Sequence, residues 1–477
     1  MAHEFYQMSA REVRVALEVD VVVAGGGFAG ICAAVGASRA GAKVAVVERD
    51  GLLGGQAAEI YTFGLDAAFG DAGRQIIKGL PWEIIQRTAR LGDSDPSWFN
   101  VDIETLEREG YDKALAPLGM SAAWKSGAWL DRSAFRHVLG SLCQETEVTV
   151  LLESPITGAM LEGDRITGVI AQGSYWPFAV AGLAVVDTTP YAAVAAAAGR
   201  PFPYPEVYLG THPHVSGVKI EPLIRFVCEH PDDVKVTGVD RPDVARLSAL
   251  VGRGVPLLFG GFTAVRQRAI KDDPAYEETG RSDRGDSVFY YDQEGRGTYW
   301  VRAARWGNCR LDDPLQMSQA ILGLRRRQWV THQMFRRYVP GFEHAHLEDV
   351  HPHIARALHI STDPGGFTDY DVTWADIQRG GPERDDLVTR VMGHPNKGQP
   401  ANGWLLPYAA MLPKGLEGLL VTGKPACRFI HYHGTVGAVG QAAGVAAALA
   451  ALGKTTPRQL PAAAVRDELR RQGAVVD

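Results

Sequence analysis

The chain has 477 residues, more than one ordinary domain core accommodates, so we expect two domains that interleave along the sequence. Hydrophobic residues make up 46% and charged residues 22%, which is the composition of a soluble globular protein. The net charge of -6 gives no strongly basic surface, so nucleic acid is excluded as an expected partner.

The five cysteines are scattered, and none of them forms a C-x-x-C pair. This spacing excludes a disulfide framework, a cysteine zinc site and a redox dithiol. Residues 1–18 contain no apolar run of signal-peptide length, and we find no stretch long and apolar enough to cross a bilayer. We therefore expect a cytoplasmic protein without a membrane span.

The strongest local signal is the segment DVVVAGGGFAG at residues 20–30. Asp20–Ala24 is rich in valine, which is typical of a strand buried on both faces of a parallel sheet. The six residues that follow match G-x-G-x-x-G. In that pattern Gly25 permits a tight turn, Gly27 lets the backbone approach a pyrophosphate, and Gly30 lets the next helix pack close to the strand.

The elements that follow complete this fingerprint. A helix is expected from Ala29 to Ala40, with Gly41 at its end and with its first amides facing the phosphates. A second strand is expected from Lys43 to Val47, and Glu48 then lies 18 positions after Gly30, where an acid accepts hydrogen bonds from a ribose. The alternative is a glycine-rich turn that binds no ligand.

A second glycine pair, Gly54-Gly55, comes soon after the second strand and is followed by Gln56. This pair is not part of the minimal NAD fingerprint. It fits a second close approach of the backbone to a long cofactor, and the alternative is an ordinary turn.

The stretch VVVAGGGFAGICAAVGASRAGAKVAVVERDGLLGG resembles the opening of the FAD-dependent oxidoreductases of the glutathione-reductase structural superfamily. It is most similar to the branch with a Gly-Gly pair after the fingerprint, a broad group found in bacterial genomes. Three later segments extend the resemblance: Trp129–Leu142 with the β-rich stretch after it, Val185–Thr189, and Gly418–Ala450. It implies FAD as the cofactor, with Ile156 making a backbone contact to adenine.

The pattern and the resemblance together assign the following residues to the cofactor site: Gly25, Gly27, Phe28, Ala29, Gly30, Glu48, Arg49, Gly54, Gly55, Gln56, Ile156, Asp187, Gly423, Gly440 and Gln441. Two segments depart from the family pattern. Thr189-Pro190-Tyr191 replaces a glycine and acids, and residues 351–362 lack a pair of arginines. Both departures concern the substrate side more than the fold.

The predicted fold class is α/β: a Rossmann-like FAD-binding domain, with a parallel sheet and helices in three layers, and an inserted α+β substrate-binding domain. Inside the insertion, Val215–Val227 and Ser287–Val301 look like strands, and Ala320–Tyr338 reads as an arginine-rich helix with a solvated face. The FAD-binding domain is expected over residues 1–65, 125–200 and 400–455, the insertions over 66–124 and 201–399, and a C-terminal tail helix over 456–477.

Toward the C-terminus, Gly418–Thr422 reads as a short strand that leads to Gly423. Gly437, Gly440 and Gly444 lie in an otherwise alanine- and valine-rich helix, where each glycine costs about 1 kcal/mol. Close approach to a cofactor would offset this cost. The alternative is a tight helix–helix contact built on small residues.

Candidate catalytic residues lie between this strand and this helix. His433, His431 and Arg428 are the candidates, and His433 is preferred because a neutral imidazole there can take a proton from the substrate. The alternative is that the histidines are structural. No metal is expected, because the cluster His351, His353 and His359 has no nearby cysteine or carboxylate to complete a familiar ligand spacing.

The predicted function is dehydrogenation of a small organic substrate by hydride transfer to flavin. No second G-x-G-x-x-G follows a strand, so we expect oxygen or an external electron acceptor rather than an internal NAD(P)H domain. The alternatives are a flavoenzyme with a net non-redox isomerisation or elimination and an FAD-binding electron-transfer subunit. The oligomeric state, a homo-oligomer included, is left open.

Overall fold

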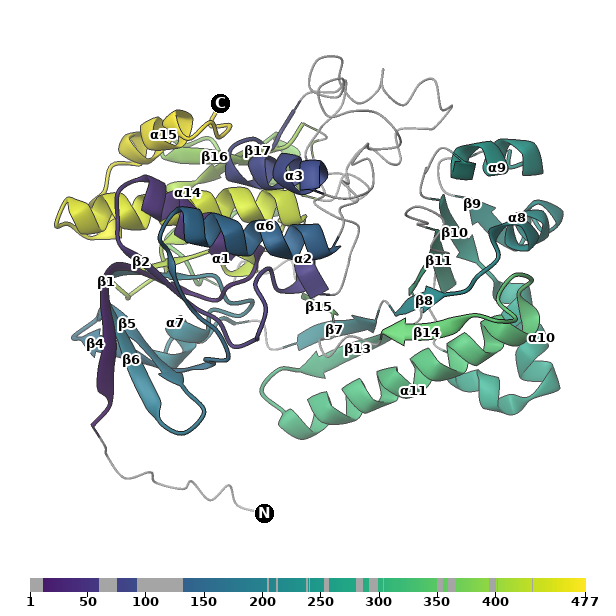
Figure 1. The fold of residues 1–477 in the computed structure, drawn as a ribbon. Coiled ribbons are helices and arrows are strands. Elements are labelled where there is room, and N and C mark those ends of the chain that lie inside the picture. Colours follow the sequence, from purple (N-terminus) through teal and green to yellow (C-terminus); the bar gives the residue numbers. More distant parts are fainter. Residues whose placement is uncertain are drawn as a thin grey trace.

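The computed structural model describes residues 12–59, 75–91, 132–203, 206–211, 213–236, 239, 241–252, 257–279, 286–290, 299–302, 304–349, 355–358, 366–393, 400, 402–430 and 432–477. These residues form two parts that lie next to each other, each built around its own sheet (Figure 1).

The first part contains a seven-stranded mixed sheet in the order β3-β2-β1-β6-β5-β4, with β18 also paired to β6. β1, β2, β3, β6 and β18 pair in parallel, whereas β4, β5 and β6 form an antiparallel meander. The parallel strands confirm the predicted α/β class. The strands are β1 (Arg14–Ala24), β2 (Val44–Val47), β3 (Thr149–Leu151), β4 (Ile156–Glu162), β5 (Arg165–Gln172), β6 (Pro177–Asp187) and β18 (Leu419–Val421).

Two helices from opposite ends of the chain pack side by side against this sheet (Figure 1). They are α1 (Phe28–Arg39) and α14 (His433–Leu452), and most residues of both are buried. The shorter helices around them are α2 (Gln56–Glu59), α3 (Leu80–Leu91), α6 (Arg132–Glu145), α7 (Ala193–Ala197), α13 (Gly423–Ala426) and α15 (Ala462–Arg471). Between α7 and α15 in sequence lie α12 (Trp374–Gln378), β16 (Leu387–Val391), β17 (Trp404–Pro407), and the 3-10 helices Tyr408–Met411 and Pro457–Gln459.

Helix α14 corrects one expectation from the sequence. Among the described residues it is the one helix long and apolar enough to cross a membrane by length and composition, although we found no such stretch in the sequence. However, 83% of its most apolar window is buried inside the protein. A core helix passes the same test, so this is weak evidence for a membrane span.

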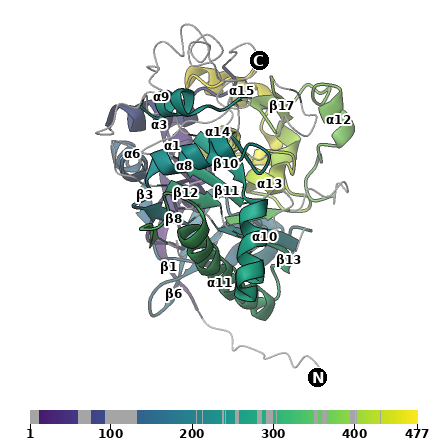
Figure 2. The same cartoon turned by 90° about the vertical axis from the view of Figure 1, so that its right-hand side faces the viewer.

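The second part contains an antiparallel six-stranded sheet, ordered β14-β8-β12-β11-β10-β9, and a three-stranded sheet, ordered β13-β7-β15. Helices α10 and α11 lie side by side on this part (Figure 2). Its strands are β7 (Glu206–Thr211), β8 (His214–Ser216), β9 (Val234–Val236), β10 (Leu257–Gly261), β11 (Asp286–Tyr290), β12 (Tyr299–Arg302), β13 (Ala304–Arg310), β14 (His346–Asp349) and β15 (Ala355–Leu358). Its helices are α8 (Ile220–Glu229), α9 (Val244–Gly252), α10 (Thr263–Asp272), the 3-10 helix Pro274–Glu278, and α11 (Pro314–Tyr338).

Two local predictions in this part differ from the structure. The stretch Val215–Val227 is not one strand, because β8 ends at Ser216 and α8 buries apolar residues at helical spacing. The long helix α11 begins at Pro314, six residues before the predicted start. Asp313 caps it by accepting hydrogen bonds from the amides of Leu315 and Gln316, and proline suits the first helical position.

Candidate functional site

The carboxyl ends of three parallel strands meet at one edge of the seven-stranded sheet. Ala24 at the end of β1 pairs with Asp187 at the end of β6, and Asp187 pairs with Val421 at the end of β18. The loops after these strands therefore start side by side, although they come from both ends of the chain. Ligands of open α/β sheets bind outside the carboxyl ends of the strands.

The glycine turn after β1 needs glycine at two positions for internal reasons. Gly25 has a φ of +101°, and a Cβ on Gly30 would lie only 1.9 Å from the carbonyl oxygen of Gly25. The hydroxyl of Thr188 holds the turn from the neighbouring strand, at 2.9 Å from the Ala24 carbonyl oxygen and 2.8 Å from that of Gly25. Thr188 was not predicted, because nothing in the local sequence links it to a turn so far away.

Gly27 is different, because its own surroundings do not require glycine. Its backbone is in an ordinary extended conformation, with φ -63° and ψ 176°. Among the described residues, no atom lies within 4 Å of the position that a Cβ would take. Gly27 is the N-cap of α1, where no side chain caps the helix and no acidic residue occupies the first turn. Backbone amides at such a helix start fit the diphosphate of a dinucleotide.

The second glycine segment lies directly against the first. The amide of Gly54 donates to the carbonyl oxygen of Gly26 at 2.8 Å, and Gly54 forms an isolated bridge with Gly27. A Cβ on Gly55 would lie 3.3 Å from the Cα of Gly27. The two segments thus form one bare backbone surface. Gln56, at the start of α2, is half-buried beside it.

Glu48 anchors the end of the second strand. Its carboxylate accepts hydrogen bonds from the amides of Gly26 at 2.5 Å and of Asp50 at 2.9 Å, and burial raises its pKa. A carboxylate offers about four lone-pair positions, so acceptor capacity remains for sugar hydroxyls. The neighbouring Arg49 is half-exposed and pairs with Asp50.

The segment before Ile156 lies beside Glu48. The amide of Ser154 donates to the Glu48 carbonyl oxygen at 2.8 Å, and Ile156 then begins β4. The structure therefore brings together the acid and the residue that the resemblance assigns to adenine.

Asp187 is fully buried, and protein groups occupy its carboxylate. It accepts hydrogen bonds from the amide and hydroxyl of Thr189 and from the amides of Val194 and Ala195. Burial raises its pKa to about 6. The side chain orders the turn after β6 and the start of α7, so its geometry gives no support to the predicted cofactor contact.

The glycines of α14 pack against α1. A Cβ on Gly440 would lie 2.2 Å from the carbonyl oxygen of Ala29, and a Cβ on Gly444 would lie 1.9 Å from that of Ala33. Gln441 is also used inside the protein, since its Oε1 accepts a hydrogen bond from the Leu80 amide. This is the helix–helix alternative from the sequence. It leaves the predicted cofactor contacts of Gly440 and Gln441 without a geometric argument.

The same packing explains two other predicted site residues. The ring of Phe28 packs on Phe135 with centroids 5.9 Å apart, and a Cβ on Gly437 would lie 2.5 Å from that ring. Ala29 is buried under α14. For both residues the backbone amide is therefore the group that remains for a cofactor.

The start of α14 places the preferred catalytic candidate. His433 is the first residue of the helix and is not fully exposed, and burial lowers its pKa to about 4. The imidazole is therefore neutral near pH 7. Arg428 stacks on Phe429 at 4.8 Å, and its carbonyl oxygen accepts a hydrogen bond from Lys424 Nζ.

Gly423 comes shortly before these residues, at the start of α13. It has a φ of +62°, and no atom of the described residues lies within 4 Å of its Cβ position. His431 and the cluster His351, His353 and His359 lie outside the described residues. Within the part of the chain that is described, no group of three or more His, Cys, Asp or Glu side chains is arranged to hold a metal ion.

Comparisons with known proteins agree with this arrangement. The family model described as FAD dependent oxidoreductase matches residues 20–360 and 377–469, which confirms the resemblance seen in the sequence. No curated protein matches the chain.

Among solved structures, the chain is similar to three flavoprotein entries of known fold. GidA from Aquifex aeolicus is 16% identical with a TM-score of 0.45, and the match covers 92% of this chain and 64% of that one. L-Amino acid deaminase from Proteus myxofaciens is 14% identical with a TM-score of 0.42, covering 94% and 93%. Glycine oxidase from Bacillus cereus is 11% identical with a TM-score of 0.39, covering 96% and 98%.

Proposed function

The chain belongs to the family of FAD dependent oxidoreductases, and from this premise we propose that it dehydrogenates a small organic molecule. Its cofactor is FAD, which supplies a two-electron acceptor for a hydride when it is bound. The observation that carries the proposal is the meeting of both ends of the chain at one sheet edge. That meeting puts the glycine turn next to the loop that leads to His433.

We propose that the cofactor's diphosphate binds at the start of α1, against Gly27 and Gly55. The open Cβ direction of Gly27 supports this, since a methyl group would fill that space. Glu48 would accept hydrogen bonds from the ribose, with Ile156 next to the adenine. The two occupied oxygen positions of Glu48 hold its carboxylate in place for this task.

We propose that His433 takes the proton that the substrate loses from its hydroxyl or amine group. A base must be unprotonated to do so, and the low pKa of His433 keeps its imidazole neutral throughout the physiological range. Its place at the first residue of α14 also matters. The helix start has no side-chain cap, so its amides favour negative charge near the reacting centre.

The remaining parts of the proposal concern the partners of the reaction. The second part of the molecule, within residues 201–399, would bind the substrate, and oxygen or an external acceptor would take up the electrons. All five cysteines are free thiols, which supports a reducing cytoplasm.

The test is anaerobic mixing of the FAD-saturated protein with panels of amino acids, amines, 2-hydroxy acids and sugar derivatives. The proposal expects one class to bleach the visible absorbance of oxidised flavin, and oxygen or a dye to restore it. Turnover without bleaching, together with a need for pre-reduced flavin, would instead indicate a non-redox isomerisation or elimination. Reduction only by a co-expressed protein would indicate an electron-transfer subunit.

A further inference from the structure

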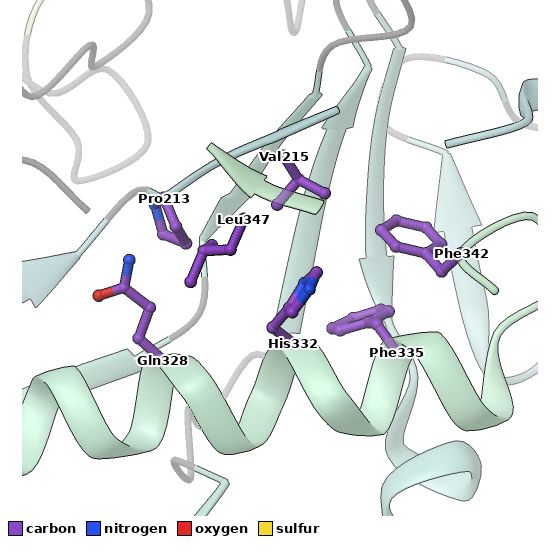
Figure 3. A pocket seen from close by; sticks show the side chains of 7 residues that line it. All are labelled: Pro213, Val215, Gln328, His332, Phe335, Phe342 and Leu347. Atoms are coloured by element: carbon purple, nitrogen blue, oxygen red, sulfur yellow. The ribbon is translucent and has the colours of Figure 1, made fainter. Parts of the chain in front are cut away.

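A small pocket lies in the second part of the molecule, between α11 and the strands β8 and β14 (Figure 3). Three of its side chains come from one face of α11, because positions i, i+4 and i+7 of a helix point the same way. The others come from the two strands and from the segment after α11. The six side chains that matter are Gln328, His332, Phe335, Phe342, Val215 and Leu347.

Gln328 is the unusual member of this set. Its side chain is 1% exposed, and it points into the space between α11 and the strands (Figure 3). Neither its Oε1 nor its Nε2 has a hydrogen-bond partner among the described residues. Buried polar side-chain atoms in native proteins are nearly always hydrogen-bonded, so a buried amide with both ends unused points to a bound partner.

The other walls define what that partner is. Phe335 and Phe342 contact each other with ring centroids 5.2 Å apart, and Val215 and Leu347 are apolar. Burial, with the charge of Arg336 nearby, lowers the pKa of His332 to about 4. Among the described residues that line the pocket, none is therefore charged near pH 7. A charged ligand would lose its hydration without gaining a counter-charge, so the pocket favours a neutral one.

We propose that this pocket binds a small neutral molecule with an amide-type edge, such as a lactam, a carboxamide or a cyclic imide. Gln328 offers an acceptor and a donor side by side, and only a ligand edge with a donor next to an acceptor satisfies both. The empty space is about 210 Å³, including the part open to solvent. A water molecule takes about 30 Å³, so a single ring fits when it extends to the open side.

A single ordered water is the competing occupant, because the narrow part of the space just accommodates one. The test uses the FAD-saturated protein and two probes, 2-piperidone and N-methyl-2-piperidone, which lacks the N–H donor. Saturation-transfer NMR and calorimetric titration measure their binding. Gln328→Met removes both polar atoms at nearly the same volume. Gln319→Met makes the same change at an exposed position of α11.

The proposal expects saturable binding of 2-piperidone to the unchanged protein and to the Gln319→Met variant. Binding should be at least tenfold weaker for N-methyl-2-piperidone and for the Gln328→Met variant. That variant should keep its FAD content and melt no earlier, since it loses two unpaired polar atoms. Equal binding to Gln328→Met, absence of saturation at any soluble concentration, or a crystal structure with one water on Gln328 that 2-piperidone does not displace would each overturn it.

This outcome is separate from that of the proposed dehydrogenation. The pocket is built from α11, β8 and β14, and none of the glycine segments or Glu48 takes part in it. A protein that binds FAD and bleaches with a substrate can still fail to bind the lactam, and the reverse is equally measurable.

Discussion

The substitution Gly27→Ala separates binding of the cofactor from stability of the fold. The backbone at Gly27 has φ -63° and ψ 176°, which alanine adopts without strain. No described atom lies within 4 Å of the new methyl group. The apoprotein should therefore fold as before. If the diphosphate of FAD packs on this backbone, the methyl group takes the space that it needs.

The magnitudes follow from these two surroundings. An extra methyl group in a close contact costs about 1–3 kcal/mol, which corresponds to an about 5- to 150-fold weaker Kd for FAD. The free energy of unfolding of the apoprotein should stay the same or rise by about 0.4–1 kcal/mol, because alanine restricts the unfolded chain more than glycine does. The control Gly30→Ala should do the opposite, since its methyl group would meet the Gly25 carbonyl oxygen at 1.9 Å.

The assay is a titration of the apoprotein with FAD, followed by flavin fluorescence, together with urea unfolding of the same samples. Thermal denaturation at rising FAD concentrations gives a second measure, because a ligand of the native state raises the melting temperature by mass action. If the folded Gly27→Ala variant bound FAD as tightly as the unchanged protein, the diphosphate would not lie against residue 27. The site argument would then be wrong.

Four further substitutions test other parts of the structure. Glu48→Gln places an NH₂ donor against a buried amide donor, so urea unfolding should show about 1–3 kcal/mol less stability, and an FAD titration should show weaker binding. Gly444→Ala puts a methyl group 1.9 Å from a carbonyl oxygen of α1 and should destabilise the protein by about 1–3 kcal/mol, whereas the control Gly252→Ala meets no described atom. The native pKa of His332, near 4, lies below its ordinary 6.5, so the unfolded chain binds the extra proton between these values and stability falls as pH falls through that window. His332→Leu should remove up to about 1.4 kcal/mol per pH unit from the slope of unfolding free energy against pH. His433→Asn should lower kcat on the substrate found by about 10²- to 10⁴-fold while FAD content is kept; an unchanged kcat would exclude it as the base.

The beginning of the fold was predictable because its constraints are local. The strand, the glycine turn, the helix and the acid all lie within about thirty residues, and each has a backbone or hydrogen-bonding reason for its residue type. The structure adds Thr188, which holds the turn from 163 residues away. A threonine after a strand carries no signal by itself, so only the pairing of β1 with β6 reveals its contact.

The errors in the second part have a different cause. Residues Val215–Val227 are mostly apolar, and a short apolar run fits a buried strand as well as a buried helix face. Tertiary packing decides between them: β8 is the short strand between β12 and β14, and α8 then buries Leu223, Ile224 and Val227. The start of α11 was missed for the opposite reason. Its Asp313-Pro314 signal was present in the sequence, but it preceded the arginine-rich stretch on which the prediction rested.

The glycines near the C-terminus show what a sequence cannot separate. A glycine in a helix indicates a close neighbour, but a cofactor and another backbone give the same pattern. The direction of the absent Cβ separates them: at Gly440 and Gly444 it points at carbonyl oxygens of α1, whereas at Gly27 and Gly423 it points at no described atom. A surface already filled by the protein cannot also receive a ligand. The cofactor contacts are therefore to be sought at Gly27 and Gly423, whose strands end side by side at the same sheet edge. Of these two, only Gly27 has a φ that alanine accepts, which makes it the cleaner position for the experiment.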